Sequence, residues 1–273
     1  MSFPELVLLG VIAGFTIFLG LPIGRLTSRS SGLVAVLNAI TIGVLLFLLW
    51  DVLSHAVGPI ETVLLDASAG TPGAGWLFAG LAAIFVAALA IGVMSLVAYD
   101  RWMGRESAQA TRAAGGVLRL HEPASRLAFL IAVGIGLHNF SEGLAIGQSA
   151  AGGELRLAVV LVVGFGLHNA TEGFGITAPL AGGTTRPSWL QLGLLGLIGG
   201  LPTLVGTLLG GVFVNNAVSI AFLALAAGSI LYVIVQLVGV SLRMGKGYRL
   251  FGGLLLGLFA GFATDFVVTA AGV

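Results

Sequence analysis

The stretch VGIGLHNFSEGLAIG at 133–147 returns thirty residues later as VGFGLHNATEGFGIT at 163–177, with nine of fifteen positions identical. Both copies lie in the middle of long apolar segments, and only a short loop joins the two segments. Consecutive segments with a short connection pack as antiparallel neighbours. The repeat therefore predicts two adjacent helices whose motif-bearing faces meet.

Each copy carries a His and a Glu four positions apart, His138 with Glu142 and His168 with Glu172. On a helix this spacing places both side chains on one face, one turn apart. An acid at the centre of a bilayer costs about 2.5–3.5 kcal/mol, so a proton, a hydrogen-bonded His or a bound cation must offset that cost. Imidazole and carboxylate suit Zn²⁺, and also Fe²⁺ or Mn²⁺. Because the same four residue types occur twice, the motif favours a bound dication over a simple packing contact.

The composition indicates a membrane protein. Of the 273 residues, 58% are hydrophobic and only 8% are charged, whereas soluble domains carry about 25% charged residues. The net charge of +1 argues against nucleic acid as a partner, and the absence of Cys excludes disulfides and thiolate metal sites. No basic residue precedes Arg25, so we expect the first apolar run to be a span rather than a cleaved signal peptide.

Eight stretches reach the length of about 20 apolar residues that a membrane helix needs. We therefore expect an all-α, polytopic membrane protein with a single transmembrane domain over 1–273. The eight predicted transmembrane helices are 4–24, 33–56, 75–99, 127–150, 156–179, 189–213, 217–242 and 250–271.

The basic residues predict the orientation. If both termini are extracytoplasmic, every Lys and Arg except Arg156 faces the cytoplasm, eleven of the twelve in all. This is the distribution that the positive-inside rule requires. We thus expect a multi-pass protein of the inner membrane with a cytoplasmic loop at 100–126.

Other polar residues inside the spans are candidates for the same site or for a path to it. Asn139 and Asn169 could supply amide oxygens to a cation, orient the neighbouring histidines or form interhelical hydrogen bonds. Asp51 could reach the central site from the second span, with His55 nearer the outer face.

Two further candidates lie in the last two spans. Asp265, in the outer part of the eighth span, could attract cations at the mouth. Gln236 is a mid-span amide that could act as a ligand, in gating or in packing.

At these residues the chain resembles the ZIP family of zinc–iron permeases, in particular its prokaryotic GufA-like branch. The paired HNxxEG motifs carry the resemblance, and the eight spans and the long loop between the third and fourth agree with it. It implies that the main metal ligands are His138, Glu142, His168 and Glu172, and that a second metal position falls on Asn139 and Asn169. It further implies a ligand at Asp51 and an entrance acid at Asp265.

The chain also departs from the family pattern. Ser141 and Thr171 stand where the family commonly has Pro. Asn169, Thr203 and Gln236 are neutral where family members with two metals often carry acids. Since each change removes negative charge, the resemblance implies one ion at a largely mononuclear site.

We therefore expect a transporter, not an enzyme, that admits a divalent cation to the cytoplasm. Zn²⁺ leads as the substrate, followed by Fe²⁺, Mn²⁺ and Cd²⁺. Its surroundings are the lipid bilayer, and a homodimer is one assembly that the sequence allows. Two alternatives remain: an intramembrane zinc-dependent hydrolase, and a proton-handling or structural protein whose two motif acids stay protonated.

Overall fold

A computed structural model describes residues 2–25, 31–109, 117–120, 122–151, 155–181, 186–212, 215–244 and 247–270; the side chain of His168 is outside this described part. No strand occurs among these residues, so the expected all-α class is confirmed. The elements are α1 (Phe3–Phe15), the short 3₁₀ helices η1 (Thr16–Leu19) and η2 (Leu21–Arg25), α2 (Ser31–Ser68), α3 (Ala74–Gln109), α4 (Pro123–Ala151), α5 (Leu155–Ala181), α6 (Trp189–Gly210), α7 (Asn216–Met244) and α8 (Tyr248–Ala270).

Seven helical segments of the described residues are long and apolar enough to cross a membrane: Phe3–Arg25, Ala35–Ser68, Ala74–Trp102, Pro123–Ala151, Trp189–Gly210, Asn216–Arg243 and Tyr248–Val267. The chain is thus a multi-pass helical membrane protein. The remaining helix, α5, is 27 residues long and carries the second motif. Eight spans, extracytoplasmic termini and the choice of membrane stay predictions.

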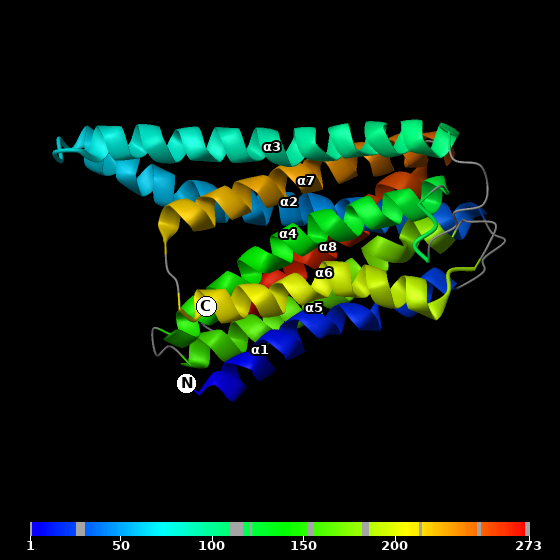
Figure 1. The fold of residues 1–273 in the computed structure, drawn as a ribbon, viewed down its shortest axis with the longest axis horizontal. Helices are drawn as coiled ribbons and strands as arrows, with labels where there is room; N and C mark the ends of the chain where they lie inside the picture. The colour runs from blue at the N-terminus through cyan, green and yellow to red at the C-terminus, as the bar shows by residue number, and fades with distance from the viewer. Residues whose placement is uncertain are drawn as a thin grey trace.

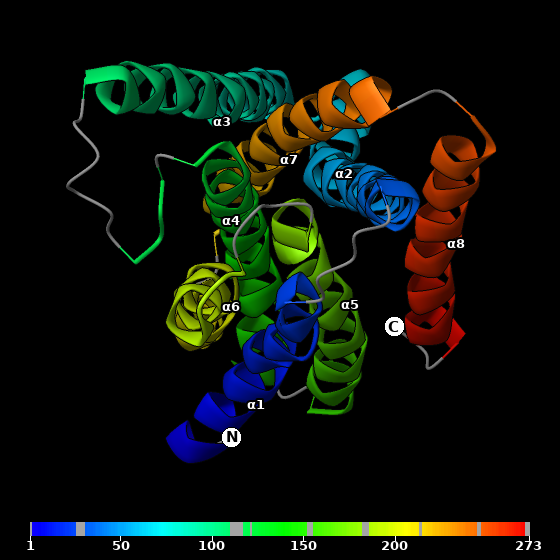
Figure 2. The same cartoon turned by 90° about the vertical axis from the view of Figure 1, so that its right-hand side faces the viewer.

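The helices run roughly side by side along the long axis of the molecule, and α1 begins near the end of the bundle at which α8 finishes (Figure 1). Figure 2 shows α4 and α5 with α1 and α6 beside them, and α3, α7 and α2 across one side. Packed pairs include α4 with α6, α2 with α8 and α3 with α7. In the most apolar 18-residue stretch of each helix, 72% of the stretch is buried in α4, against 22% in α3 and 17% in α8. The first motif therefore lies at the centre of the protein.

Two helices extend well past their predicted ends. The second and third spans were expected over 33–56 and 75–99, but α2 continues to Ser68 and α3 to Gln109. Pro59 does not end α2, although proline inside a helix removes one backbone hydrogen bond. The break comes instead at Gly70 and Gly73, both with positive φ, which glycine adopts without strain. Because α3 reaches Gln109 and α4 begins at Pro123, the predicted loop at 100–126 is helical at both ends.

Glycines bring α4 and α6 into direct backbone contact. A Cβ on Gly143 would meet the Thr203 carbonyl oxygen of α6, and a Cβ on Gly206 would meet the Phe140 carbonyl oxygen of α4. Small residues at such crossings allow membrane helices to approach closely. A Cβ on Gly136 would meet the Ile198 carbonyl oxygen of α6 as well, so the close approach extends to both sides of the first motif. The packing of α4 against α6 therefore fixes the depth and rotation of that motif.

Candidate metal site

α4 places His138 and Glu142 one turn apart on a buried face. The side chains are only 2% and 6% exposed, and His138 Nε2 lies 3.2 Å from Glu142 Oε1. The i, i+4 pairing expected from the sequence is therefore present in the structure. The pair lies on a helix of which 72% of the most apolar stretch is buried.

The second motif helix brings Glu172 to the same imidazole ring. Its Oε1 atom lies 3.9 Å from His138 Nε2, and the residue is 1% exposed. The structure thus brings together His138, Glu142 and Glu172 from two neighbouring helices. His168 lies on α5 four residues before Glu172, but its side chain is outside the described residues.

The three described groups are arranged as ion-pair partners. Among the side chains that the structure describes, no group of three or more His, Asp or Glu residues has the geometry to hold a metal ion. Glu142 and Glu172 instead approach one ring nitrogen from two helices. Two carboxylates beside one imidazole leave a net negative charge unless a proton or cation is added, and a buried charge of this kind is costly.

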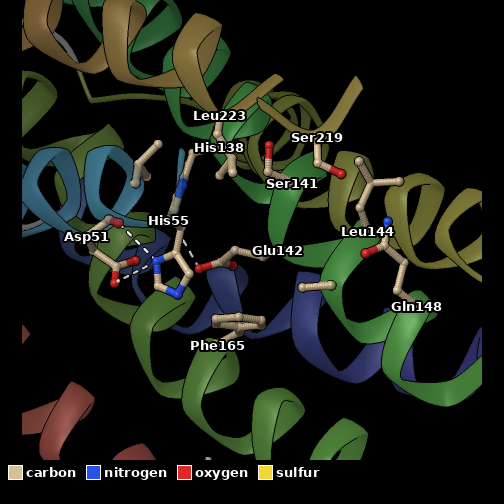
Figure 3. A pocket seen from close by; sticks show the side chains of 12 residues that line it. Asp51, His55, His138, Ser141, Glu142, Leu144, Gln148, Phe165, Ser219 and Leu223 are labelled. Atoms are coloured by element: carbon tan, nitrogen blue, oxygen red, sulfur yellow. Dashed lines mark hydrogen bonds and ion pairs between the residues drawn. The ribbon is translucent and has the colours of Figure 1, made fainter. Parts of the chain in front are cut away.

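A cavity of about 220 Å³ opens beside this cluster, and Figure 3 shows His138 and Glu142 pointing from α4 toward Asp51 and His55 of α2. At about 30 Å³ per water molecule in the liquid, it has room for roughly seven waters. Its lining consists of Asp51, Val52, His55, His138, Ser141, Glu142, Leu144, Ala145, Gln148, Phe165, Ser219 and Leu223. Glu172 does not line it. The cavity therefore gives access to one side of the buried cluster.

Asp51 and His55 form a second His–carboxylate pair on the cavity wall. His55 Nδ1 lies 3.4 Å from Asp51 Oδ1 and 2.9 Å from the Asp51 carbonyl oxygen. The His55 side chain is 68% exposed, and that of Asp51 is 21% exposed. Their placement agrees with the sequence-based proposal that Asp51 reaches toward the central site and that His55 lies farther out.

The two motif asparagines form interhelical hydrogen bonds. Asn139 Nδ2 donates to the Gly199 carbonyl oxygen of α6, and Asn169 Nδ2 donates to the Ala13 carbonyl oxygen of α1, each at 3.0 Å. Both residues are fully buried. Of the three roles that the sequence left open, the interhelical hydrogen bond is the one that the structure contains, while orientation of the histidines and ligation by the amide oxygens stay predictions.

Three other candidates lie away from the cavity lining. Gln236 Nε2 donates to Tyr232 Oη at 2.7 Å on the same helix, which is a packing contact. Thr203 is fully buried in α6 beside Gly143, and its hydroxyl has no hydrogen-bond partner among the described residues. Asp265 is half-buried on α8. None of the three lines the cavity, and their pathway roles stay predictions.

The structure adds lining residues that the sequence did not single out. Gln148 lies on the same face of α4 as His138, Ser141 and Ala145, at helical spacings of three and four. That spacing is a signal that could have identified Gln148 from the sequence. Phe165 and Ser219 come from α5 and α7, and no pattern in the sequence marks them.

No protein-family model matches this chain, and no curated protein matches it. The functional argument therefore depends on the geometry of its own residues.

Proposed function

We propose that this protein is a transporter for a divalent transition-metal ion, with Zn²⁺ as the leading substrate. The observation that carries the proposal is the convergence of Glu142 and Glu172, from two helices, on the buried His138 ring. A dication bound there would balance two carboxylates that are 6% and 1% exposed, where an uncompensated charge is costly. The paired HNxxEG motifs and their resemblance to the ZIP permeases point to the same function.

The open cavity favours transport over a purely structural role. It joins the outer pair, Asp51 and His55, to the buried pair, His138 and Glu142. A cation could enter it with part of its water shell and exchange that water for protein ligands as it approaches His138. Movement of the site between the two membrane faces then follows the alternating-access scheme of secondary transporters. The predicted orientation makes the direction inward, across the inner membrane.

The direct test uses purified protein in liposomes that contain a zinc-sensitive dye. We expect saturable Zn²⁺ uptake that Cd²⁺, a d¹⁰ dication like Zn²⁺, inhibits strongly. Mn²⁺ should inhibit more weakly, because it stands at the low-affinity end of the Irving–Williams series. Ca²⁺ and Mg²⁺ should not compete, since they prefer oxygen-only sites. Zinc binding without any uptake above that of empty liposomes would contradict transport, and hydrolysis of a lipid or peptide by that protein would favour the hydrolase.

Asp51→Asn should weaken the capture of zinc without preventing its movement. The substitution keeps the shape of the cavity wall but removes a negative charge beside the path to His138. We expect the zinc concentration for half-maximal uptake to rise about tenfold, which corresponds to about 1.4 kcal/mol, with little change in the maximal rate. Asp66→Asn, on an exposed position near the end of α2, is the matched control. Equal uptake curves for both variants would remove Asp51 from the path.

A further inference from the structure

The two motif asparagines make equivalent contacts with two different helices. Each directly follows the motif His, and each donates its amide hydrogen to a backbone carbonyl of a helix outside the motif pair. For Asn139 the acceptor is Gly199 in α6, and for Asn169 it is Ala13 in α1. The two copies of the motif therefore share a tertiary contact as well as a sequence: in each, the Asn is hydrogen-bonded to the backbone of another helix.

The two acceptors lie at one helix crossing. Gly199 precedes Gly200 and Ala13 precedes Gly14. A Cβ on Gly14 would meet the Gly200 carbonyl oxygen, and a Cβ on Gly200 would meet that of Gly14, so α1 and α6 touch through their backbones here. One asparagine attaches α4 to this crossing, and the other attaches α5 to it. Four helices are thus connected at the depth of the two motifs.

These bonds are placed where they control the direction of the histidines. A side-chain tip lies about 5–6 Å from the helix axis, so a rotation of about 10° moves it by roughly 1 Å. A metal–ligand bond tolerates only about 0.2 Å of variation. An amide that is bonded to a neighbouring helix one residue after the His prevents such a rotation. The Ala13 carbonyl also accepts from Thr16 Oγ1 at 2.7 Å, so side chains hold this acceptor from two directions.

We propose that Asn139 and Asn169 are positioning residues for the cation site, which act by donating to the Gly199 and Ala13 carbonyls: Asn139 thereby orients His138, and Asn169 fixes the rotation of α5. This inference rests on the proposed function, because it assigns a task to the same site. The sequence left this role open beside ligation by the amide oxygens, and the structure adds the two carbonyl acceptors that would fix the side chains. Because the amide nitrogens make these bonds, the test below must decide whether the amide oxygens also contact the cation.

The test is a double-mutant cycle on zinc binding, measured by titration calorimetry with the full-length protein in detergent. Asn139→Ala should lower zinc affinity about 10- to 100-fold, the range typical when a partner that orients a metal ligand is lost. In a His138→Ala background the same substitution should have no further effect, because there is no ring left to orient. In a Glu142→Gln background, Asn139→Ala should still lower the zinc affinity, because the His138 ring is still present. Asn169→Ala should behave in the same way with respect to His168→Ala.

Controls separate positioning from ligation and from general packing. A ligand role predicts that Asn139→Ala weakens binding by the same factor with or without His138, and that result would overturn the inference. Thr177→Val removes another fully buried polar group, one bonded only within its own helix, and should leave zinc affinity unchanged. An equal loss of affinity in Thr177→Val would also overturn the inference, since packing alone would then explain the effect. Melting temperatures without metal identify variants that fail to fold.

A second measurement covers the case in which the double-mutant cycle cannot be completed. If His138→Ala binds too little zinc to measure, X-ray absorption at the zinc edge of Asn139→Ala decides. An unchanged number of nitrogen and oxygen ligands supports positioning, and the loss of an oxygen ligand contradicts it. Wild-type protein that binds zinc without transporting it would remove the proposed function but leave this test intact. Wild-type affinity in Asn139→Ala would overturn the inference and leave the function standing.

Discussion

Replacing His138 by Ala or Glu172 by Gln is expected to reduce zinc uptake into liposomes by about a hundredfold or more. Loss of a residue that merely orients a metal ligand costs 10- to 100-fold, so loss of a group that contacts the ion should cost at least as much. Glu172 reaches the ring of His138 from the other motif helix. Either change therefore alters one partner of the His138–Glu172 contact between the two helices, along with one donor for the ion.

The stability of the metal-free protein separates this explanation from simple misfolding. Glu172 is 1% exposed, and a buried carboxylate without a cation is costly. Glu172→Gln keeps the size and shape of the buried side chain, so the variant should still fold without metal, while zinc no longer raises its melting temperature. Glu61→Gln, an exposed position on α2, should transport normally. Near-normal uptake in both His138→Ala and Glu172→Gln would refute the assignment of the site.

The sequence predicts the centre of this site well because the centre depends on local geometry. The four-residue spacing of His138 and Glu142 requires only that the segment be helical. The approach of Glu172 requires in addition that two consecutive helices pack side by side, which a short loop favours. Both expectations depend on few long-range contacts, and both agree with the distances of 3.2 and 3.9 Å in the structure.

Contacts between distant parts of the chain could not be predicted from the sequence pattern. Asn139 bonds a carbonyl 60 residues away and Asn169 one 156 residues away, and only the tertiary fold identifies these acceptors. Gln236 looked like a candidate ligand because a mid-span amide needs a partner, but its partner is Tyr232 on its own helix. The lengths of α2 and α3 were missed because hydropathy reports the thickness of the membrane, and a helix can continue beyond it.

Gly143→Ala is expected to destabilise the protein strongly, although it adds only one methyl group. The new Cβ would lie 2.8 Å from the Thr207 backbone nitrogen and 2.9 Å from the Thr203 carbonyl carbon, besides meeting the Thr203 carbonyl oxygen. These are backbone atoms of α6 and cannot rotate away as a side chain would. The helices must separate, and overpacking of a well-packed core typically costs about 1–3 kcal/mol. We expect a clear fall in melting temperature and a loss of zinc binding, because Glu142 is the preceding residue.

Gly80→Ala is the matched control, since it adds the same methyl group to a helix. A Cβ at Gly80 in α3 would have no neighbour within 4 Å, and alanine is favoured over glycine inside helices by about 1 kcal/mol. Gly80→Ala should therefore have an equal or slightly higher melting temperature and normal zinc binding. If the two alanine variants melt at the same temperature, α4 and α6 do not meet through their backbones at Gly143. In that case the depth and rotation of the first motif would need another explanation, because the contact that holds it in register would be absent.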